Sequence, residues 1–189
     1  MTRLSIFVLL FAVGAAGAQD MPLHEILKPG ETWQPHAGGM PAVDKPSQLP
    51  KRGLPVKEAT CAVVGLGGST LFVADATDRY VWAFRIEKDG TIGPGDRYVR
   101  MRVAGDDRRR KVTPPEAYRA DPSAMTIDAA NRLYAATNLG IQVFDPTGRL
   151  CGVFTAPPGR VTELAFDGDR LYARVGDNVF VRKMLAEGK

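Results

Sequence analysis

The sequence is poor in the residues that most often carry catalysis or covalent cross-links. Its 189 residues include only two histidines and two cysteines, which excludes a disulfide-stapled mini-protein and gives little support to a Ser-His-Asp or Cys-His active site. Cys61 and Cys151 could form a disulfide if the chain is exported to an oxidising compartment, but we expect both to be buried free thiols. The net charge of +4 is a mild excess that indicates no nucleic-acid partner.

The sequence also lacks an apolar run of the roughly 20 residues that are needed to cross a bilayer. Its most apolar stretch, Leu4 to Val13, follows Arg3 and ends in Ala16-Gly17-Ala18. A positive start, an apolar centre and an A-x-A end are typical of a secretory signal peptide. We therefore predict a signal peptide over residues 1-18, cleavage before Gln19, and a secreted or periplasmic protein with no membrane attachment after cleavage. A membrane anchor is the alternative.

Residues 19-60 form a Pro/Gly-rich N-terminal segment with little strand pattern. Proline fixes φ and removes a backbone donor, so we expect at most a short helical turn at Leu23 to Leu27, surface loop elsewhere and few core contacts. Both histidines, His24 and His36, lie in this segment and are expected to face solvent. Its prolines are Pro22, Pro29, Pro35, Pro41, Pro46, Pro50 and Pro55.

After Thr60 the pattern becomes that of short β-strands separated by turns. Large apolar residues alternate from Tyr80 to Ile86, which is typical of a strand, and Asp89-Gly90 predicts a hairpin turn. Further strands are predicted at Thr70 to Ala74, Ala124 to Ile127, Arg132 to Ala136, Ile141 to Phe144, Arg149 to Phe154, Val161 to Phe166, Leu171 to Arg174 and Val179 to Met184.

One strand recurs along the chain. Thr70-Leu71-Phe72-Val73-Ala74, Arg132-Leu133-Tyr134-Ala135-Ala136 and Arg170-Leu171-Tyr172-Ala173-Arg174 are versions of it, spaced by 62 and 38 residues, with an insertion through Gly105 to Ala120. A repeat of about 40 residues that holds several strands is typical of propeller blades. We predict an all-β fold, with about three four-stranded blades of a partial β-propeller in residues 61-184 after the Pro-rich N-terminal segment. A β-sandwich binding module is the alternative.

Three blades do not close a ring, because closed propellers have at least four. The outer blades would then expose flanks that normally pack on a neighbour. We therefore expect a homodimer through an exposed blade flank, in which a twin chain buries it.

Carboxylates at strand ends or turns are the remaining candidates for acid, base or metal chemistry. Asp commonly hydrogen-bonds the backbone nearby at such places, so we expect a structural role for each of Asp75, Asp128, Asp145 and Asp167.

The segment Ser123-Ala124-Met125-Thr126-Ile127-Asp128, continued by Asn131-Arg132-Leu133-Tyr134, resembles a late blade of the senescence marker protein, gluconolactonase and luciferin-regenerating enzyme family. Val161 to Phe166 resembles the closing blade of that family, and Ser69 to Asp75 a middle one. The resemblance extends to Leu23-His24-Glu25-Ile26-Leu27 and covers residues 23-44 and 60-184 in total.

The resemblance implies a six-bladed ring of which this chain is a truncated member. About half of the propeller is missing between Asp44 and Thr60, and residues 19-60 would be the remnant of the first blade. The resemblance also implies one divalent cation, such as Ca²⁺, Mg²⁺ or Mn²⁺, in the central channel and the opening of lactones or related esters, with the ion polarising the carbonyl.

The cation ligands of the family are a Glu in a Glu-Gly-Pro context, an Asn before a middle-blade strand and an Asp in an Asp-Gly-Met context that also acts as the base. The corresponding positions here are Gly39, Thr60 and Ser123. The candidate catalytic carboxylate is Asp121, close to the last of these, but one carboxylate does not make a stable site for a hard cation. The sequence therefore predicts a gluconolactonase-like protein without the metal-dependent site and without a cofactor.

The alternative is an active metal-dependent lactonase or esterase that retains Ca²⁺ or another divalent cation. Asp121 would then be joined near the metal by Glu58 or Glu116. The convergence of two of these carboxylates on one point would favour this alternative.

Overall fold

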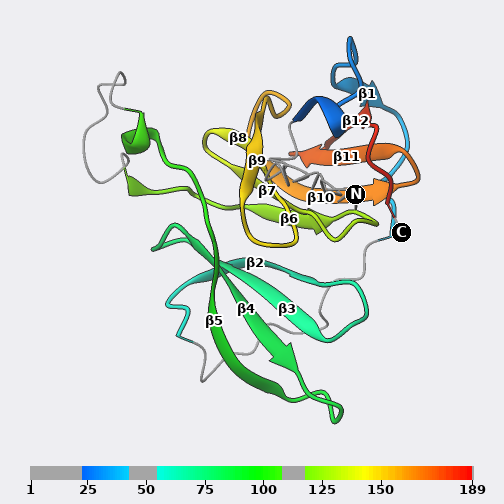
Figure 1. The fold of residues 1–189 in the computed structure, drawn as a ribbon. Helices are drawn as coiled ribbons and strands as arrows, with labels where there is room; N and C mark the ends of the chain where they lie inside the picture. The colour runs from blue at the N-terminus through cyan, green and yellow to red at the C-terminus, as the bar shows by residue number, and fades with distance from the viewer. Residues whose placement is uncertain (1–22, 43–54, 108–117, 189) are drawn as a thin grey trace, which may run out of the picture.

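The computed structural model describes residues 23–42, 55–107 and 118–188. In this part of the chain, the helical elements are short 3-10 turns such as η1 (Leu23–Glu25) and η2 (Ala104–Asp106), and no helix is long and apolar enough to span a membrane. The strands form three separate four-stranded antiparallel sheets, as Figure 1 shows. The predicted signal peptide over residues 1-18 lies outside the described residues.

Blade 1 consists of the four consecutive strands β2 (Ala59–Val64), β3 (Thr70–Asp75), β4 (Tyr80–Ile86) and β5 (Ile92–Arg100). The predicted strands at 70–74 and 80–86 are confirmed. The hairpin predicted at Asp89-Gly90 is also confirmed, because Gly90 has a φ of 82° and its N–H bonds the Glu87 carbonyl at 2.9 Å. Two glycines and Pro94 lie in β5, which is an outer strand, where a missing ladder donor is tolerated.

Blade 2 consists of β6 (Ala124–Ile127), β7 (Leu133–Thr137), β8 (Gly140–Phe144) and β9 (Leu150–Phe154), again in chain order. All four predicted strands are confirmed to within about one residue at each end. Gly140 is required at its position, because its φ is +116° and a Cβ there would lie 2.5 Å from the Phe154 carbonyl oxygen.

Blade 3 is built from both ends of the chain. The strands β10 (Val161–Asp167), β11 (Arg170–Val175) and β12 (Asn178–Lys183) are joined at the outer edge by β1 (Gln34–His36), which pairs antiparallel with β12. Loop was expected at β1, and that expectation is wrong. The proline that obscured this strand is tolerated because β1 is an edge strand.

The N-terminal segment also makes core contacts that were not expected. The short helical turn at Leu23–Glu25 is confirmed, but the Ile26 side chain after it is fully buried. The Trp33 ring stacks on Phe154, and its indole N–H donates to the Thr155 carbonyl at 2.8 Å. His24 is exposed as predicted, whereas His36 is half-buried with its ring against Tyr172. This segment therefore fastens blade 2 to blade 3.

The three blades fan out from a row of inner strands. β6 lies beside both β2 and β10, and Figure 1 shows these three strands at the centre. The recurring sequence occupies β3, β7 and β11, the second strand of each blade, which confirms the repeat. Two apolar cores fill the seams between neighbouring blades. The fold is therefore a partial β-propeller, and the β-sandwich alternative is wrong.

Three of the four strand-end aspartates have the predicted structural role. The Asp128 carboxylate is fully buried and accepts bonds from the Ala130 N–H, the Arg132 guanidinium and the Tyr134 hydroxyl. Asp75 and Asp145 each accept the N–H and the hydroxyl of the threonine two residues on. The fourth, Asp167, is exposed at the end of β10.

Candidate functional site

Two clefts open where the inner strands begin. The first, about 360 Å³, lies between blades 2 and 3 and is lined by residues that include Asp121, Ser123, Asn138 and Arg160. The second, about 410 Å³, lies between blades 1 and 2 and is lined by Glu58, Ala76, Thr77, Arg119, Asp121 and Asn138. Because Asp121 and Asn138 line both clefts, the two form one region, which we call the inner-strand cleft. Its volume is in the range of small-molecule sites.

An ion pair between Asp121 and Arg160 lines the inner-strand cleft, in the part between blades 2 and 3. The Arg160 guanidinium donates to both carboxylate oxygens of Asp121, with Nη2 at 3.1 Å from Oδ1. Hydrogen bonding to this carboxylate raises the pKa of Arg160 above its ordinary value. About half of each side chain remains exposed, 55% for Arg160 and 44% for Asp121, so a molecule from solvent can reach both groups.

The backbone around Asp121 is strained and held in place. Asp121 has a φ of +50°, in the left-handed region that few residues other than glycine adopt. The turn between β7 and β8 secures the residues just before it. There the side-chain amide of Asn138 donates to the Arg119 carbonyl at 2.9 Å, and the backbone N–H of Asn138 donates to the Ala120 carbonyl at 3.0 Å. Strain of this kind clusters at functional sites.

The three positions that the sequence resemblance predicts to correspond to the family's cation ligands are Gly39, Thr60 and Ser123, and none of them is a carboxylate. Ser123 precedes β6, and its hydroxyl donates to the Ala136 carbonyl at 3.5 Å. Thr60 lies near the start of β2 and donates to the Ala74 carbonyl at 3.5 Å. Gly39 is exposed beyond β1. Thr60 and Ser123 thus lie near the starts of adjacent inner strands. Ser123 lines the first cleft, whereas Thr60 and Gly39 line neither.

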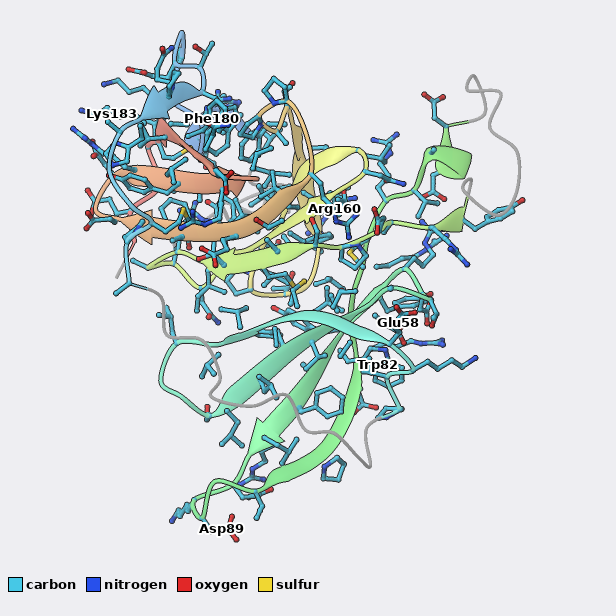
Figure 2. All side chains as sticks on the ribbon, turned by 180° about the vertical axis from the view of Figure 1, so that it is seen from behind. Glu58, Trp82, Asp89, Arg160, Phe180 and Lys183 are labelled. Atoms are coloured by element: carbon cyan, nitrogen blue, oxygen red, sulfur yellow. The ribbon has the colours of Figure 1, made fainter. Side chains whose placement is uncertain are left out.

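Of the other two candidate carboxylates, Glu58 and Glu116, only Glu58 lies among the described residues. Glu58 is exposed at the start of blade 1 and lines the same cleft as Asp121. Figure 2 shows Glu58 and Arg160 on the same side of the molecule. Glu116 lies outside the described residues. Two of the predicted carboxylates are therefore brought to one cleft, but no common ligand position is defined for them.

The residues that sequence reasoning missed are Arg160 and Asn138. Arg160 follows Pro157-Pro158-Gly159 and Asn138 occupies a tight turn, so each belongs to a stretch that also fits an ordinary solvent-exposed loop. The one available signal is the position of Arg160 directly before an inner strand, which Ser123 shares in the preceding blade. Position in the repeat, rather than any motif, could have identified it.

Neither cysteine is suited to nucleophilic chemistry. Both are free thiols, each partly buried. Burial raises the pKa of Cys61 to about 12, and burial likewise raises the pKa of Cys151. Since the thiolate is the reactive form, both groups are protonated and unreactive near neutral pH.

The donor atoms in the inner-strand cleft do not fit a hard divalent cation. Such an ion prefers several carboxylate and carbonyl oxygens, but both oxygens of Asp121 are bonded to a guanidinium and the neighbouring Ser123 supplies a neutral hydroxyl. Across residues 23–42, 55–107 and 118–188, no three His, Cys, Asp or Glu side chains gather as a metal-binding group.

Radial antiparallel blades around a row of inner strands, with a polar cleft at one end of that row, define this protein as one of the β-propeller class. The match to a family model is more specific. Residues 61–173 match the SMP-30/Gluconolactonase/LRE-like region. The chain therefore belongs to this family, as the sequence resemblance predicted. Among curated proteins, none matches the chain.

Solved structures with the same fold include members of this family. A gluconolactonase from Xanthomonas campestris is 19% identical with a TM-score of 0.52, and the match covers 68% of this chain and 38% of that one. A luciferin-regenerating enzyme is 18% identical, with a TM-score of 0.50 and coverages of 71% and 48%.

A calcium-binding regucalcin from Agrobacterium tumefaciens is 13% identical, with a TM-score of 0.53 and coverages of 71% and 48%. The chain thus spans less than half the length of each of these three proteins. At these identities the likeness concerns the fold.

Proposed function

We propose that this protein is an exported member of the gluconolactonase-like family that binds a small polar ligand in the inner-strand cleft and does not hydrolyse lactones with a metal ion. The observation that carries the proposal is the ion pair between Asp121 and Arg160 in the wall of the cleft. Both side chains are about half exposed, so a ligand with hydroxyl or carboxylate groups can bond to them directly.

The chemistry of the ion pair argues against metal-assisted hydrolysis. A metal ion accelerates this reaction by polarising the carbonyl and by lowering the pKa of a bound water. A guanidinium stays protonated, and its positive charge opposes a second cation nearby. A general base must also be free to accept a proton, whereas both oxygens of Asp121 already accept hydrogen bonds from Arg160.

One observation favours the alternative, a metal-dependent lactonase or esterase. Glu58 and Asp121 line the same cleft, and two carboxylates on one cleft could serve as ligand and base. Arg119 lines this cleft as well, and Arg160 holds Asp121. The cleft therefore presents at least as much positive as negative charge, and the binding function is the better supported of the two.

The deciding experiment measures hydrolysis of γ- and δ-lactones by the purified protein with added Ca²⁺ or Mn²⁺ and, separately, with chelator. We expect no cation-dependent turnover. The matched variant is Ser123→Asp, which returns a carboxylate to the family's position beside Asp121, with Thr162→Asp as a control at an exposed site on β10. Turnover by the unmodified chain that is lost with chelator and restored by Ca²⁺ or Mn²⁺ would contradict the proposal.

Export is tested independently of the cleft. The proposal predicts that the intact gene product is recovered outside the cytoplasm with a mass that corresponds to a chain starting at Gln19. Replacing Leu9 and Leu10 in the apolar run by Arg should retain the uncleaved chain in the cytoplasm, because a signal peptide needs an uninterrupted apolar centre. A chain of full mass that remains membrane-bound would instead indicate an anchor.

A further inference from the structure

The part of the inner-strand cleft between blades 1 and 2 carries two opposite charges besides the ion pair. Glu58 lies at the start of blade 1 and Arg119 lies in the segment before blade 2, and both side chains are exposed. Across residues 23–42, 55–107 and 118–188, neither the Glu58 carboxylate nor the Arg119 guanidinium has a hydrogen-bond or ion-pair partner. The two groups therefore line one cleft without neutralising each other.

The backbone on both sides of this part of the cleft is fixed by hydrogen bonds. The Glu58 N–H donates to the Asp75 carboxylate at 3.2 Å, and the Glu58 carbonyl accepts from the Ala76 N–H at 2.9 Å. On the blade 2 side, the Arg119 carbonyl accepts from the side-chain amide of Asn138 at 2.9 Å. A ligand that binds between the two charges therefore has little backbone to order, which lowers the cost of binding.

The charges around this part of the cleft disfavour a ligand that carries a single charge. An anion on Arg119 would share the cleft with the carboxylates of Glu58 and Asp121. A cation on Glu58 would share it with Arg119 and, beyond Asp121, with the guanidinium of Arg160. Like charges in one cleft repel each other. A ligand that carries both signs meets an opposite charge at each end.

We propose that the inner-strand cleft binds a small zwitterion, an amino acid, with its carboxylate on Arg119 and its ammonium group on Glu58. This inference rests on the proposed function, because it names the ligand class of the same cleft. A guanidinium presents N–H donors in a planar fork that matches a carboxylate. An ammonium group has three donors and needs carboxylate or carbonyl oxygens as acceptors.

Asp121 supplies a second acceptor for the ammonium group. Its carboxylate lines the same part of the cleft as Glu58. An ionised carboxylate has about four acceptor sites, and each oxygen of Asp121 accepts one bond from Arg160, so acceptor sites remain. The ion pair with Arg160 thus holds Asp121 in place without using up its capacity to bond a ligand.

The test follows backbone amide shifts of the isotopically labelled protein by NMR during titration with glycine, β-alanine and 4-aminobutyrate. These zwitterions hold their two charges progressively farther apart. Each is compared with the carboxylate and the amine of the same chain length, which are acetate and methylammonium, propionate and ethylammonium, and butyrate and propylammonium. We expect one zwitterion to bind at least about tenfold more tightly than either of its matched ions, because both of its ends form charge-assisted hydrogen bonds. The shifts should centre on Glu58, Thr77 and Asn138, which line this part of the cleft.

Two variants assign each end of the ligand to one side chain. In Arg119→Gln the zwitterion should bind no more tightly than its matched amine, and in Glu58→Gln no more tightly than its matched carboxylate. Arg85→Gln and Glu87→Gln make the same charge changes in an exposed ion pair at the opposite end of blade 1, and they should leave the affinity unchanged. The amide spectrum of each variant also shows whether it is folded.

The inference would be overturned by a zwitterion that binds no better than its matched ions. A preference for the zwitterion that survives in Arg119→Gln or in Glu58→Gln would overturn it as well. Sorbitol, a neutral polyol, separates this inference from the proposed function. If sorbitol shifts the same amides and no zwitterion does, the amino-acid ligand is wrong and the binding function stands. If neither shifts them, the amino-acid ligand is also wrong, and the lactone assay then decides the proposed function by itself.

Discussion

Blade 1 and blade 3 share one strand order but are attached to blade 2 in different ways. Blade 3 takes its outer strand from the N-terminal segment, whose Ile26 is buried in the core between blades 2 and 3. Blade 1 is contiguous in sequence and is joined to blade 2 by an apolar seam and by the buried side chain of Gln142. The N-terminal segment links blade 3 to blade 2, because it packs in their shared core and also supplies the outer strand of blade 3. The strands of blade 1 are consecutive in the sequence, so its attachment depends on the side-chain contacts between blades 1 and 2.

The largest expected effect comes from breaking the attachment of blade 3. Ile26→Ala leaves a cavity between blades 2 and 3, because the Ile26 side chain is fully buried in that core. We expect the free energy of unfolding to fall by about 2–5 kcal/mol, as measured by urea denaturation. His24→Ala, an exposed position in the same segment, should change it by less than about 0.5 kcal/mol. Equal effects of the two variants would contradict the role given to this segment.

A smaller effect is expected from the polar attachment of blade 1. The Gln142 amide accepts from the Arg102 N–H at 2.7 Å and donates to the Arg102 carbonyl at 2.8 Å. Gln142→Ala should cost about 1–3 kcal/mol, because it leaves the partly buried backbone groups of Arg102 without these partners. Hydrogen exchange should rise in blade 1 and not in blade 3. Gln34→Ala, on the exposed edge strand β1, is the control and should leave both blades unchanged.

The smallest expected effect concerns acid. Burial raises the pKa of Asp75, but bonds from the N–H and hydroxyl of Thr77 and from the N–H groups of Lys57 and Glu58 outweigh it, and the net pKa lies below the ordinary 3.8. A carboxyl with a lowered folded-state pKa contributes stability that is present above 3.8 and is lost as the pH falls through the folded value.

Asp75→Asn should therefore flatten the acid limb of the stability profile below pH 4, measured as the urea midpoint at successive pH values. Asp89 is the matched control, because it makes the same two bonds to a threonine, at the exposed tip of blade 1 that Figure 2 labels. Asp89→Asn should flatten that limb less. An acid limb that is unaffected by Asp75→Asn would show that other carboxylates determine it.

The sequence predicts the strands of blades 2 and 3 well because their signals are local. Alternation and flanking turn residues mark strands such as Ala124–Ile127, and the repeat marks β3, β7 and β11 as equivalent. The strand Gln34–His36 was missed because a three-residue edge strand that contains Pro35 has no pattern of its own. Its pairing with Val179 to Val181 joins residues far apart in the chain, and no local preference indicates that pairing.

The candidate site, too, could be predicted from the sequence only in part. Asp121 and Ser123 were candidates from the sequence because they directly precede Ala124–Ile127, a strand that carries the family resemblance. That Gly39, Thr60 and Ser123 replace the family's cation ligands stays a prediction from that resemblance. The partner of Asp121 could not be identified. Arg160 is separated from it by 39 residues and follows a Pro-Pro-Gly turn, so only the packing of β6 against β10 brings the two side chains together.

The sequence by itself determined the class of fold, the repeat and the family, because these depend on alternation, turn chemistry and recurring residue types, which are properties of short segments. The tertiary structure decided that segments from both ends of the chain form one blade and that Arg160 bonds Asp121. The physical reason is that strand pairing between the chain ends and side-chain contact between adjacent sheets are long-range, and nothing within a short window of sequence specifies them.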